Sequence, residues 1–344
     1  MRASGDNIVK RARYFSLFSL FLILLGCLFI VNIAVGSINI PFFETCRIIV
    51  QHLADSTHGT IIWKIRLPRA LAAILCGGYL AVGGLLLQVF FRNPIVGPYI
   101  LGISSGATLM VGLVMLAGLS IGMLGIHPFL LTLAAFAGAL AVMTIILAVA
   151  AKVKDIITLL VIGLMVGYVC HAVTNVLIAF AEKEKVKGFV LWQMGSFSGF
   201  CWDEVYLVAL FGIPLLIGAY LMCKPLNAFL LGEDYAKSMG VNIKVFRFLI
   251  VIFSSALAGM VTAFAGPVAF IGLAVPHMAR LSLGTSDNRI LIPGAVLLGA
   301  TVTVLCDLIA RLLFSPVELP LSAITSFFGA PIVIGLLLKR RAIV

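Results

Sequence analysis

The chain of 344 residues is 62% hydrophobic and 11% charged, whereas an ordinary soluble domain is roughly 45–50% apolar and about 25% charged. Its net charge of +11 would suggest nucleic acid or acidic partners in a soluble protein, but the apolar composition excludes that class. Long apolar runs with little polar–apolar alternation predict spanning helices rather than an outer-membrane barrel. We therefore predict an all-α integral membrane protein with a single domain over residues 1–344.

The first apolar segment follows Arg11 and Arg13, as a secretory signal would. The run FSLFSLFLILLGCLFIVNIAV is too long for a signal core and lacks a small-x-small cleavage site. The piece LLGC, which ends at Cys27, resembles a lipoprotein cleavage box, but the apolar run continues beyond it. We interpret this segment as a spanning helix.

Charged residues, prolines and glycines divide the chain into about ten predicted spans. An even number places both termini on one side of the membrane. With both termini in the cytoplasm, 16 Lys and Arg residues lie inside and 8 lie outside, as the positive-inside rule requires. The spans cover residues 15–36, 67–91, 98–119, 129–151, 156–181, 204–223, 245–265, 269–283, 290–311 and 321–338.

Arg66 and Arg69 in the stretch RLPR, together with Arg311, fall on the outer side, where arginine is scarce. One interpretation is that they reach the outer headgroups or bind local carbonyl groups. The other is a functional role, because Arg66 and Arg69 are three residues apart on one helical face. The sequence by itself leaves both interpretations open.

Two stretches dense in small residues, 76–84 and 254–266, predict helices that approach one another closely inside the bundle. Each precedes an irregular passage rich in Pro and Gly, at 92–107 and 266–280. The chain therefore resembles two weakly similar halves with broken helices in corresponding positions, a pattern typical of transporters.

The longest polar stretch between spans, residues 224–247, is predicted to lie in the cytoplasm. Asn227 can cap a first short helix, Gly232 can end it, and Glu233 with Asp234 favours the start of a second. Gly240 can then supply a left-handed stop. This segment is either a docking site for a partner or an ordinary amphipathic loop.

Few ionisable residues lie within the spans. Asp307, four residues before Arg311, can form an ion pair that orients the arginine. His171 has no nearby carboxylate in sequence, so we expect a packing or helix-bonding role. The absence of midplane carboxylates argues against an ion-coupled carrier.

Catalytic and metal-binding signatures are missing from the sequence. It has no HExxH or GxxxxGK[ST] motif and no catalytic carboxylate pair, so we expect no enzymatic activity in this chain. The seven cysteines form no CxxC pair, and we expect no disulfide, no metal site and no cofactor. Any energy for transport must come from a partner.

Five stretches carry a resemblance that covers nearly the whole chain. They look like the iron-chelate and cobalamin class of ABC importer permeases, and they occur in the family's order and spacing. The stretches are RLPRALAAILCGGYLAVGGLLLQVFFRNPIVGPYILGISSGA, WQMGSFSG, LGEDYAKSMGVNI, FAGPVAFIGLAVPHMARLSLG and CDLIARLLFSPVELPLSAITSFFGAPIVIGLLLKRR.

The resemblance implies ten spanning helices, a homodimer or pseudo-dimer around a central pathway, two cytoplasmic ATPase subunits and an extracytoplasmic binding protein. It implies import of a metal chelate (a ferric siderophore, haem or cobalamin) across a prokaryotic inner membrane. The alternative class is an ion-coupled secondary transporter of a bulky organic solute.

The same resemblance implies roles for particular residues. Arg66, Arg69 and Arg311 match positions that receive acidic side chains of the binding protein. Residues of the stretch LGEDYAKSMGVN match the element that docks into the ATPase, and a cytoplasmic gate is expected at about 155–158. The expected coupling residues are Gly232, Glu233, Ala236 and Gly240.

Overall fold

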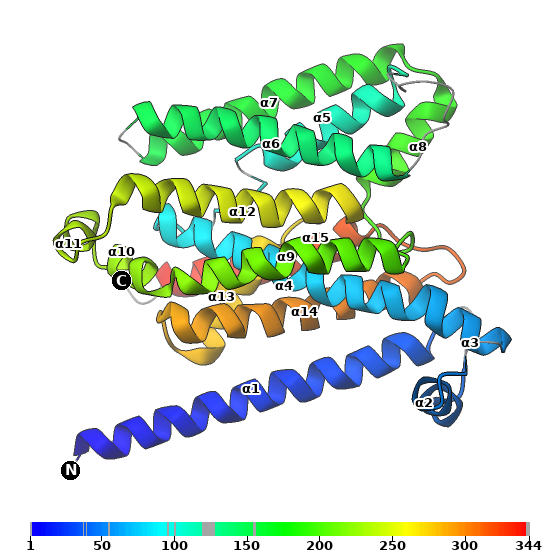
Figure 1. Cartoon of the computed structure of the whole chain (residues 1–344), viewed down its shortest axis with the longest axis horizontal. Helices are drawn as coiled ribbons and strands as arrows, with labels where there is room; N and C mark the ends of the chain where they lie inside the picture. The colour runs from blue at the N-terminus through cyan, green and yellow to red at the C-terminus, as the bar shows by residue number, and fades with distance from the viewer. Residues whose placement is uncertain are drawn as a thin grey trace.

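A computed structural model describes residues 2–36, 38, 40–53, 56–94, 96–99, 101–118, 128–153 and 156–341. Every regular element in these ranges is helical, as predicted, and most helices run along one common direction (Figure 1). The elements are α1 (Arg2–Ala34), α2 (Phe42–Val50), α3 (Thr57–Ile61), a π-helical turn η1 (Ile62–Arg66), α4 (Leu67–Phe90), α5 (Ile103–Met115), α6 (Pro128–Lys152), α7 (Ile156–Phe180), α8 (Lys183–Gln193), α9 (Trp202–Leu221), α10 (Cys223–Leu230), α11 (Glu233–Ser238), α12 (Ile243–Ala265), α13 (Ile271–Leu283), α14 (Asn288–Leu312) and α15 (Leu321–Arg341).

Helix α4 is the centre of the bundle and packs against α9, α12, α13 and α14. Its small residues allow this burial. A Cβ atom at Gly77 would lie only 2.5 Å from the carbonyl oxygen of Gly299 in α14, and one at Gly84 would overlap the backbone of Gly272 in α13. The small-residue stretches therefore mark interior helices, as the sequence predicted.

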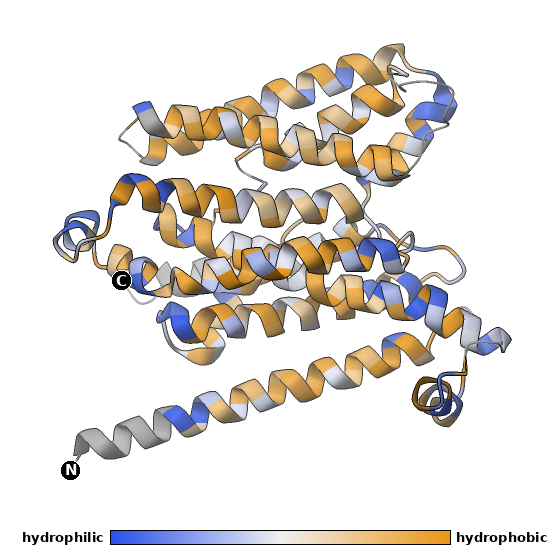
Figure 2. Ribbon diagram, viewed as in Figure 1, coloured by the Kyte–Doolittle hydropathy of each residue, from blue (hydrophilic) through white to orange (hydrophobic). Residues whose placement is uncertain are grey.

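Helices α5, α6 and α7 form a layer on the other side of α12, at the top of Figure 1. Helix α5 lies against both α6 and α7, and α6 packs on α12. The helices are apolar along much of their length, while polar residues gather toward the ends of the bundle (Figure 2), and many large apolar side chains are exposed. This distribution suits a protein surrounded by lipid.

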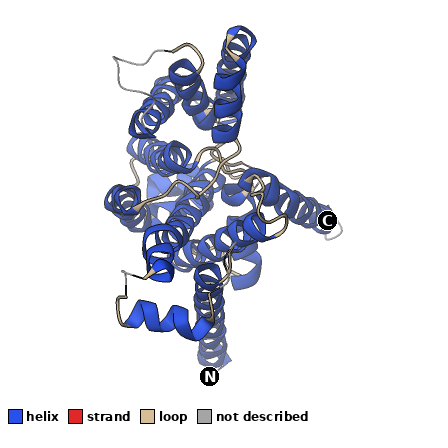
Figure 3. Ribbon diagram, turned by 90° about the vertical axis from the view of Figure 1, so that its right-hand side faces the viewer, coloured by secondary structure: helices blue, strands red, loops and turns tan. Residues whose placement is uncertain are grey.

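Seven helical segments in the described residues are long and apolar enough to cross a membrane. They correspond to seven of the predicted spans, whereas the other three correspond to α5, α13 and α15. The total of ten spans stays a prediction. Helices α2, α3 and α8 were not predicted from the sequence, and they lie between the spans at one end of the bundle (Figures 1 and 3).

Both predicted irregular passages are present, and each ends in the same local geometry. Gly102 precedes α5 with φ of 74°, and Phe270 precedes α13 with φ of 65°. Each residue is thus left-handed at the start of a short helix, and a non-glycine residue such as Phe270 rarely adopts that conformation. The similarity of the two halves itself stays a prediction.

Candidate functional site

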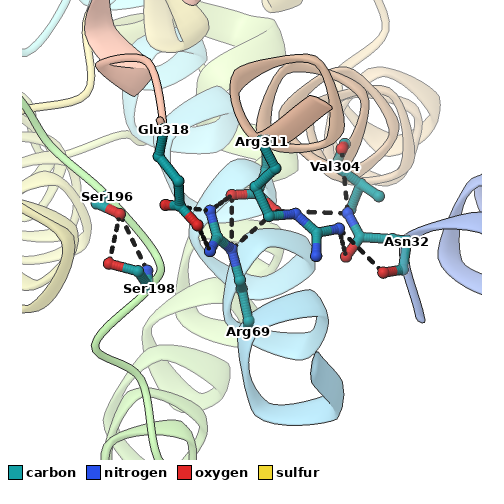
Figure 4. Close-up of polar contacts among 8 residues, drawn as sticks. Asn32, Arg69, Ser196, Ser198, Val304, Arg311 and Glu318 are labelled. Atoms are coloured by element: carbon teal, nitrogen blue, oxygen red, sulfur yellow. Dashed lines mark hydrogen bonds and ion pairs between the residues drawn. The ribbon is translucent and has the colours of Figure 1, made fainter. Parts of the chain in front are cut away.

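The segments that carry Arg66, Arg69 and Arg311 meet at the end of the bundle that carries α2 and α3 (Figure 1), and Figure 4 shows Arg69 and Arg311 there. Arg66 ends the π-helical turn, and Arg69 lies in the first turn of α4 beside Pro68, a residue suited to that turn. Arg311 lies in the last turn of α14. The structure therefore brings all three predicted docking residues into one cluster, which we call the arginine cluster.

Arg69 binds two carboxylates at once (Figure 4). Its Nε and Nη2 donate to Asp307 at 3.1 and 2.9 Å, and its Nη1 and Nη2 donate to Glu318 at 2.7 and 3.1 Å. Both contacts use the planar fork of the guanidinium group. The side chain of Asp307 is 2% exposed, whereas that of Glu318 is 42% exposed. Glu318 therefore covers the outer edge of Arg69.

Arg311 links α14 to α1. Its Nη2 donates to the backbone oxygen and the side-chain Oδ1 of Asn32, at 2.9 and 2.8 Å. Its Nε lies 3.5 Å from Oδ2 of Asp307, which confirms the predicted ion pair. The main partner of Asp307 is nevertheless Arg69. Neither this pairing nor the roles of Asn32 and Glu318 were predicted from the sequence.

Arg66 binds backbone carbonyl groups at the C-terminal end of α1. Its guanidinium group donates to the carbonyl oxygens of Ile33 and Ala34 at 2.7 and 2.8 Å, and also to that of Ile38. Ile33 and Ala34 are the last two residues of α1, where backbone acceptors lack helical partners and a cation is favourable. Arg66 thus satisfies local carbonyl groups, which was one of the two interpretations left open.

Together with the carboxylates of Asp307 and Glu318, the three residues of the arginine cluster carry a net charge of +1. All three arginines are largely buried, and each has protein partners. Buried charges of this kind persist only when they are paired. The cluster therefore joins α1, α4 and α14 to the segment before α15 at this end of the bundle.

The segment 224–247 folds as two short helices separated by a turn, as predicted. Gly232 provides the break with φ of 135°, and Glu233 occupies the first turn of α11. Glu233 also accepts a hydrogen bond of 2.9 Å from Arg247, which ties α11 to α12. Hydrogen bonding to Asp234 raises the pKa of Lys237, which remains cationic in this acidic setting.

Gly240 ends α11 in the predicted manner. Its φ is 82°, its N–H donates to Lys237 O, and the N–H of Val241 donates to Ala236 O. This pair of bonds is a Schellman motif, in which glycine avoids the steric cost of the left-handed conformation. The side chain of Ala236 is fully buried beneath the turn.

The predicted capping role of Asn227 is wrong. The residue lies inside α10, and its side chain contacts the start of α14: its Nδ2 donates to Asp287 at 2.6 Å, and its Oδ1 accepts from Asn288. The amide satisfies backbone and side-chain groups of a helix distant in sequence, which local sequence patterns cannot indicate.

The remaining candidates are His171, the expected gate at about 155–158 and the seven cysteines. His171 Nε2 lies 3.1 Å from Ser105 Oγ, a hydrogen bond between α7 and α5 that confirms the predicted role. In the expected gate, Asp155 lies outside the described residues, and 156–158 begin α7. The seven cysteines are free thiols, and the described residues contain no group of three or more His, Cys, Asp or Glu that could hold a metal.

Comparisons with known proteins agree with this geometry. The model of the FecCD transport family matches residues 22–339. The vitamin B12 import system permease BtuC of Salmonella typhi is 38% identical over 278 residues, which cover 81% of this chain and 83% of that protein. The corresponding permease of Salmonella arizonae is 37% identical over the same shares.

Among solved structures, an inward-facing metal-chelate type ABC transporter is 27% identical and superposes with a TM-score of 0.81, covering 95% of this chain and 99% of that one. PsaBC from Streptococcus pneumoniae, at 15% identity and a TM-score of 0.55, shares the fold alone, over 83% of this chain and 92% of that one. The chain is therefore a member of the FecCD transport family, a membrane permease subunit of the ABC importer type whose ATPase is a separate subunit.

Proposed function

We propose that this permease forms the translocation pathway of an ATP-driven importer for a bulky metal chelate: cobalamin, a ferric siderophore or haem. It acts as one domain over residues 1–344 in the inner membrane, as a homodimer with both termini in the cytoplasm. The family match along residues 22–339 carries the proposal. The names of the relatives and of the structural neighbour support cobalamin or another metal chelate as cargo.

Transport by purified components in proteoliposomes tests this function against the ion-coupled alternative. The permease is reconstituted with the ATPase and the binding protein encoded beside it, and the absorption spectrum of cargo bound to that binding protein identifies the chelate. We expect uptake only with ATP and all components. Uptake driven by an ion gradient without the ATPase would contradict the proposal.

We further propose that α10 and α11 form the surface that binds the ATPase, through Gly232, Glu233, Ala236 and Gly240. The support is a rigid turn: buried Ala236 and the Schellman motif at Gly240 fix α11, and the Glu233–Arg247 ion pair holds it against α12. A short helix held in this way can transmit displacement to a spanning helix.

Gly240→Val is expected to weaken association with the ATPase while membrane insertion is retained. A β-branched residue in the left-handed region costs about 1–2 kcal/mol, although no atom lies within 4 Å of the position that its Cβ would take. Co-purification of the ATPase measures the effect. Gly199→Val is the control, because its Cβ position is also open and its φ is not left-handed. Equal ATPase recovery from both variants would remove the coupling role.

We also propose that the arginine cluster, Arg66, Arg69 and Arg311, receives acidic groups of the extracytoplasmic binding protein. Asp307 is buried and accepts from Arg69 with both carboxylate oxygens, whereas the half-exposed Glu318 covers the outer edge of the same guanidinium group. An incoming carboxylate can therefore exchange with Glu318. Charge reversal at Arg69 would place a new carboxylate against Asp307, so Glu318 is the residue that tests docking without disrupting the cluster.

Glu318→Gln is expected to accelerate association with the binding protein about three- to tenfold at low salt, because it removes the competing charge. The gain should shrink as salt screens the interaction. Surface plasmon resonance over a salt series measures it. Glu182→Gln removes an exposed charge at the same end of the bundle, next to α8, and is expected to have little effect. Indistinguishable rates for both variants would contradict docking on Arg69.

A further inference from the structure

A cavity of about 260 Å³ lies beside Leu230, the last residue of α10. It is formed where α4, α13 and α14 meet that helix, away from the arginine cluster. The polar residues that line it include Gln88, Arg92, His277, Arg280, Ser286 and Asn288, and we call it the α10 cavity. Arg92 and Ser286 are exposed, so the cavity reaches the surface of the protein.

Two cations line the α10 cavity without a carboxylate among the lining residues that the structure describes. Arg92 Nη2 donates to the carbonyl oxygen of Phe229 at 3.2 Å, and its guanidinium group lies 5.0 Å from the centre of the Phe229 ring. Arg280 Nη1 donates to Gln88 Oε1 at 2.7 Å. Both arginines thus bind neutral acceptors within the described ranges, and the described residues that line the cavity carry a net positive charge that favours an anion.

Asn288, another residue that lines the cavity, has a hydrogen-bond acceptor that is unpaired among the described residues. Asn288 is fully buried, and its Nδ2 donates to Asn227 Oδ1 at 2.7 Å. Its own Oδ1 has no hydrogen-bond partner in the part of the chain that the structure describes. An unpaired buried acceptor is costly, so a ligand that brings a hydroxyl group to this position would gain affinity. A simple carboxylate has no such donor.

We propose that the α10 cavity binds a phosphate group that also carries a hydroxyl donor. The guanidinium groups of Arg92 and Arg280 receive the phosphate oxygens, and Asn288 Oδ1 accepts from the hydroxyl. Two sources share this chemistry: the headgroup of phosphatidylglycerol and free hydrogen phosphate. The cavity lies at the ends of membrane-crossing helices, the depth at which basic pockets bind anionic headgroups.

A phosphate in this position would connect α4 and α13 with α10. Phe229, which holds Arg92 by its carbonyl and its ring, is fully buried in α10 and stacks on Phe90 of α4. Occupancy of the cavity would therefore stabilise α10 against the bundle. This role is independent of the transported cargo and of docking at the opposite end.

Isothermal titration of the purified full-length permease in a neutral detergent tests the proposal. The probes are inorganic phosphate and three dihexanoyl lipids: phosphatidylglycerol, phosphatidylmethanol, which has the same charge but no hydroxyl, and phosphatidylcholine. We expect phosphatidylglycerol to bind about tenfold more tightly than phosphatidylmethanol, as one hydrogen bond to an otherwise unpaired group predicts. Phosphatidylcholine should bind more weakly still. Equal affinity for all three lipids would overturn the proposal.

Substitutions that remove a positive charge test whether the ligand binds in the α10 cavity. Arg92→Gln and Arg280→Gln should each weaken binding about tenfold or more, and Arg280→Lys should retain part of it. Arg289→Gln is the matched control, because Arg289 is exposed at the start of α14 and does not line the cavity. Equal losses in all charge variants would indicate diffuse surface attraction and overturn the site.

Titration with inorganic phosphate distinguishes the two sources of the bound group, a lipid headgroup and free phosphate. Binding of inorganic phosphate with the same dependence on Arg92 and Arg280 assigns the site to free phosphate, whereas binding of phosphatidylglycerol alone assigns it to lipid. Binding of neither probe overturns the proposal. Should Arg280→Gln fail to fold, Arg92→Gln carries the test, because Arg92 is exposed.

Discussion

Asp307→Asn is expected to destabilise the permease by about 3–5 kcal/mol, the usual cost of removing one partner from a buried ion pair. Asp307 lies between Arg69 and Arg311 and accepts from Arg69 with both carboxylate oxygens. Asparagine keeps the size of the side chain but removes the negative charge. Arg69 would keep the half-exposed Glu318 as an anionic partner, and Arg311 would have no ion-pair partner among the described residues.

Equilibrium unfolding in mixed micelles measures this loss, and two variants calibrate it. Glu318→Gln should cost about 1 kcal/mol or less, because solvent screens a half-exposed pair. Glu184→Gln, an exposed change in α8, should stay within about 0.5 kcal/mol of the parent protein. If Asp307→Asn were no more damaging than Glu318→Gln, the cluster would not depend on its buried carboxylate.

Gly84→Ala is expected to destabilise the protein by about 3 kcal/mol or more, at the upper end of overpacking effects. The added Cβ would overlap the carbonyl group of Gly272, and a backbone group cannot rotate away as a flexible side chain can. Helices α4 and α13 would have to separate, and the burial of α4 at the centre of the bundle would decrease.

Gly26→Ala is the matched control for the change at Gly84. Gly26 also lies within a long helix, α1, but a Cβ atom added there would have no other atom within 4 Å. The same methyl group should therefore be neutral there or stabilising by about 0.5–1 kcal/mol, through helix propensity. Similar losses at both positions would show that close approach of α4 and α13 does not limit stability.

Local sequence patterns were sufficient for the long helices. Predicted spans such as 67–91 and 156–181 agree with α4 and α7 within one residue at each end, because apolar runs bounded by charges and helix breakers specify these elements locally. Gly240 was also predictable, since a left-handed helix stop depends on the residue itself. The short helices α2 and α3 were missed because neither reaches the length of a membrane span.

The pairing of charges depended on the tertiary structure. Arg69 meets Asp307 and Glu318 across 238 and 249 positions of sequence, and Asn227 meets Asn288 across 61. Within the arginine cluster, the Asp307–Arg311 contact, one helical turn apart, could be derived locally. The sequence by itself determined a helical membrane protein, its central helices and its family resemblance. Packing of α1, α4 and α14 decided which polar groups meet, because a buried charge binds whatever partner the fold brings within hydrogen-bond distance.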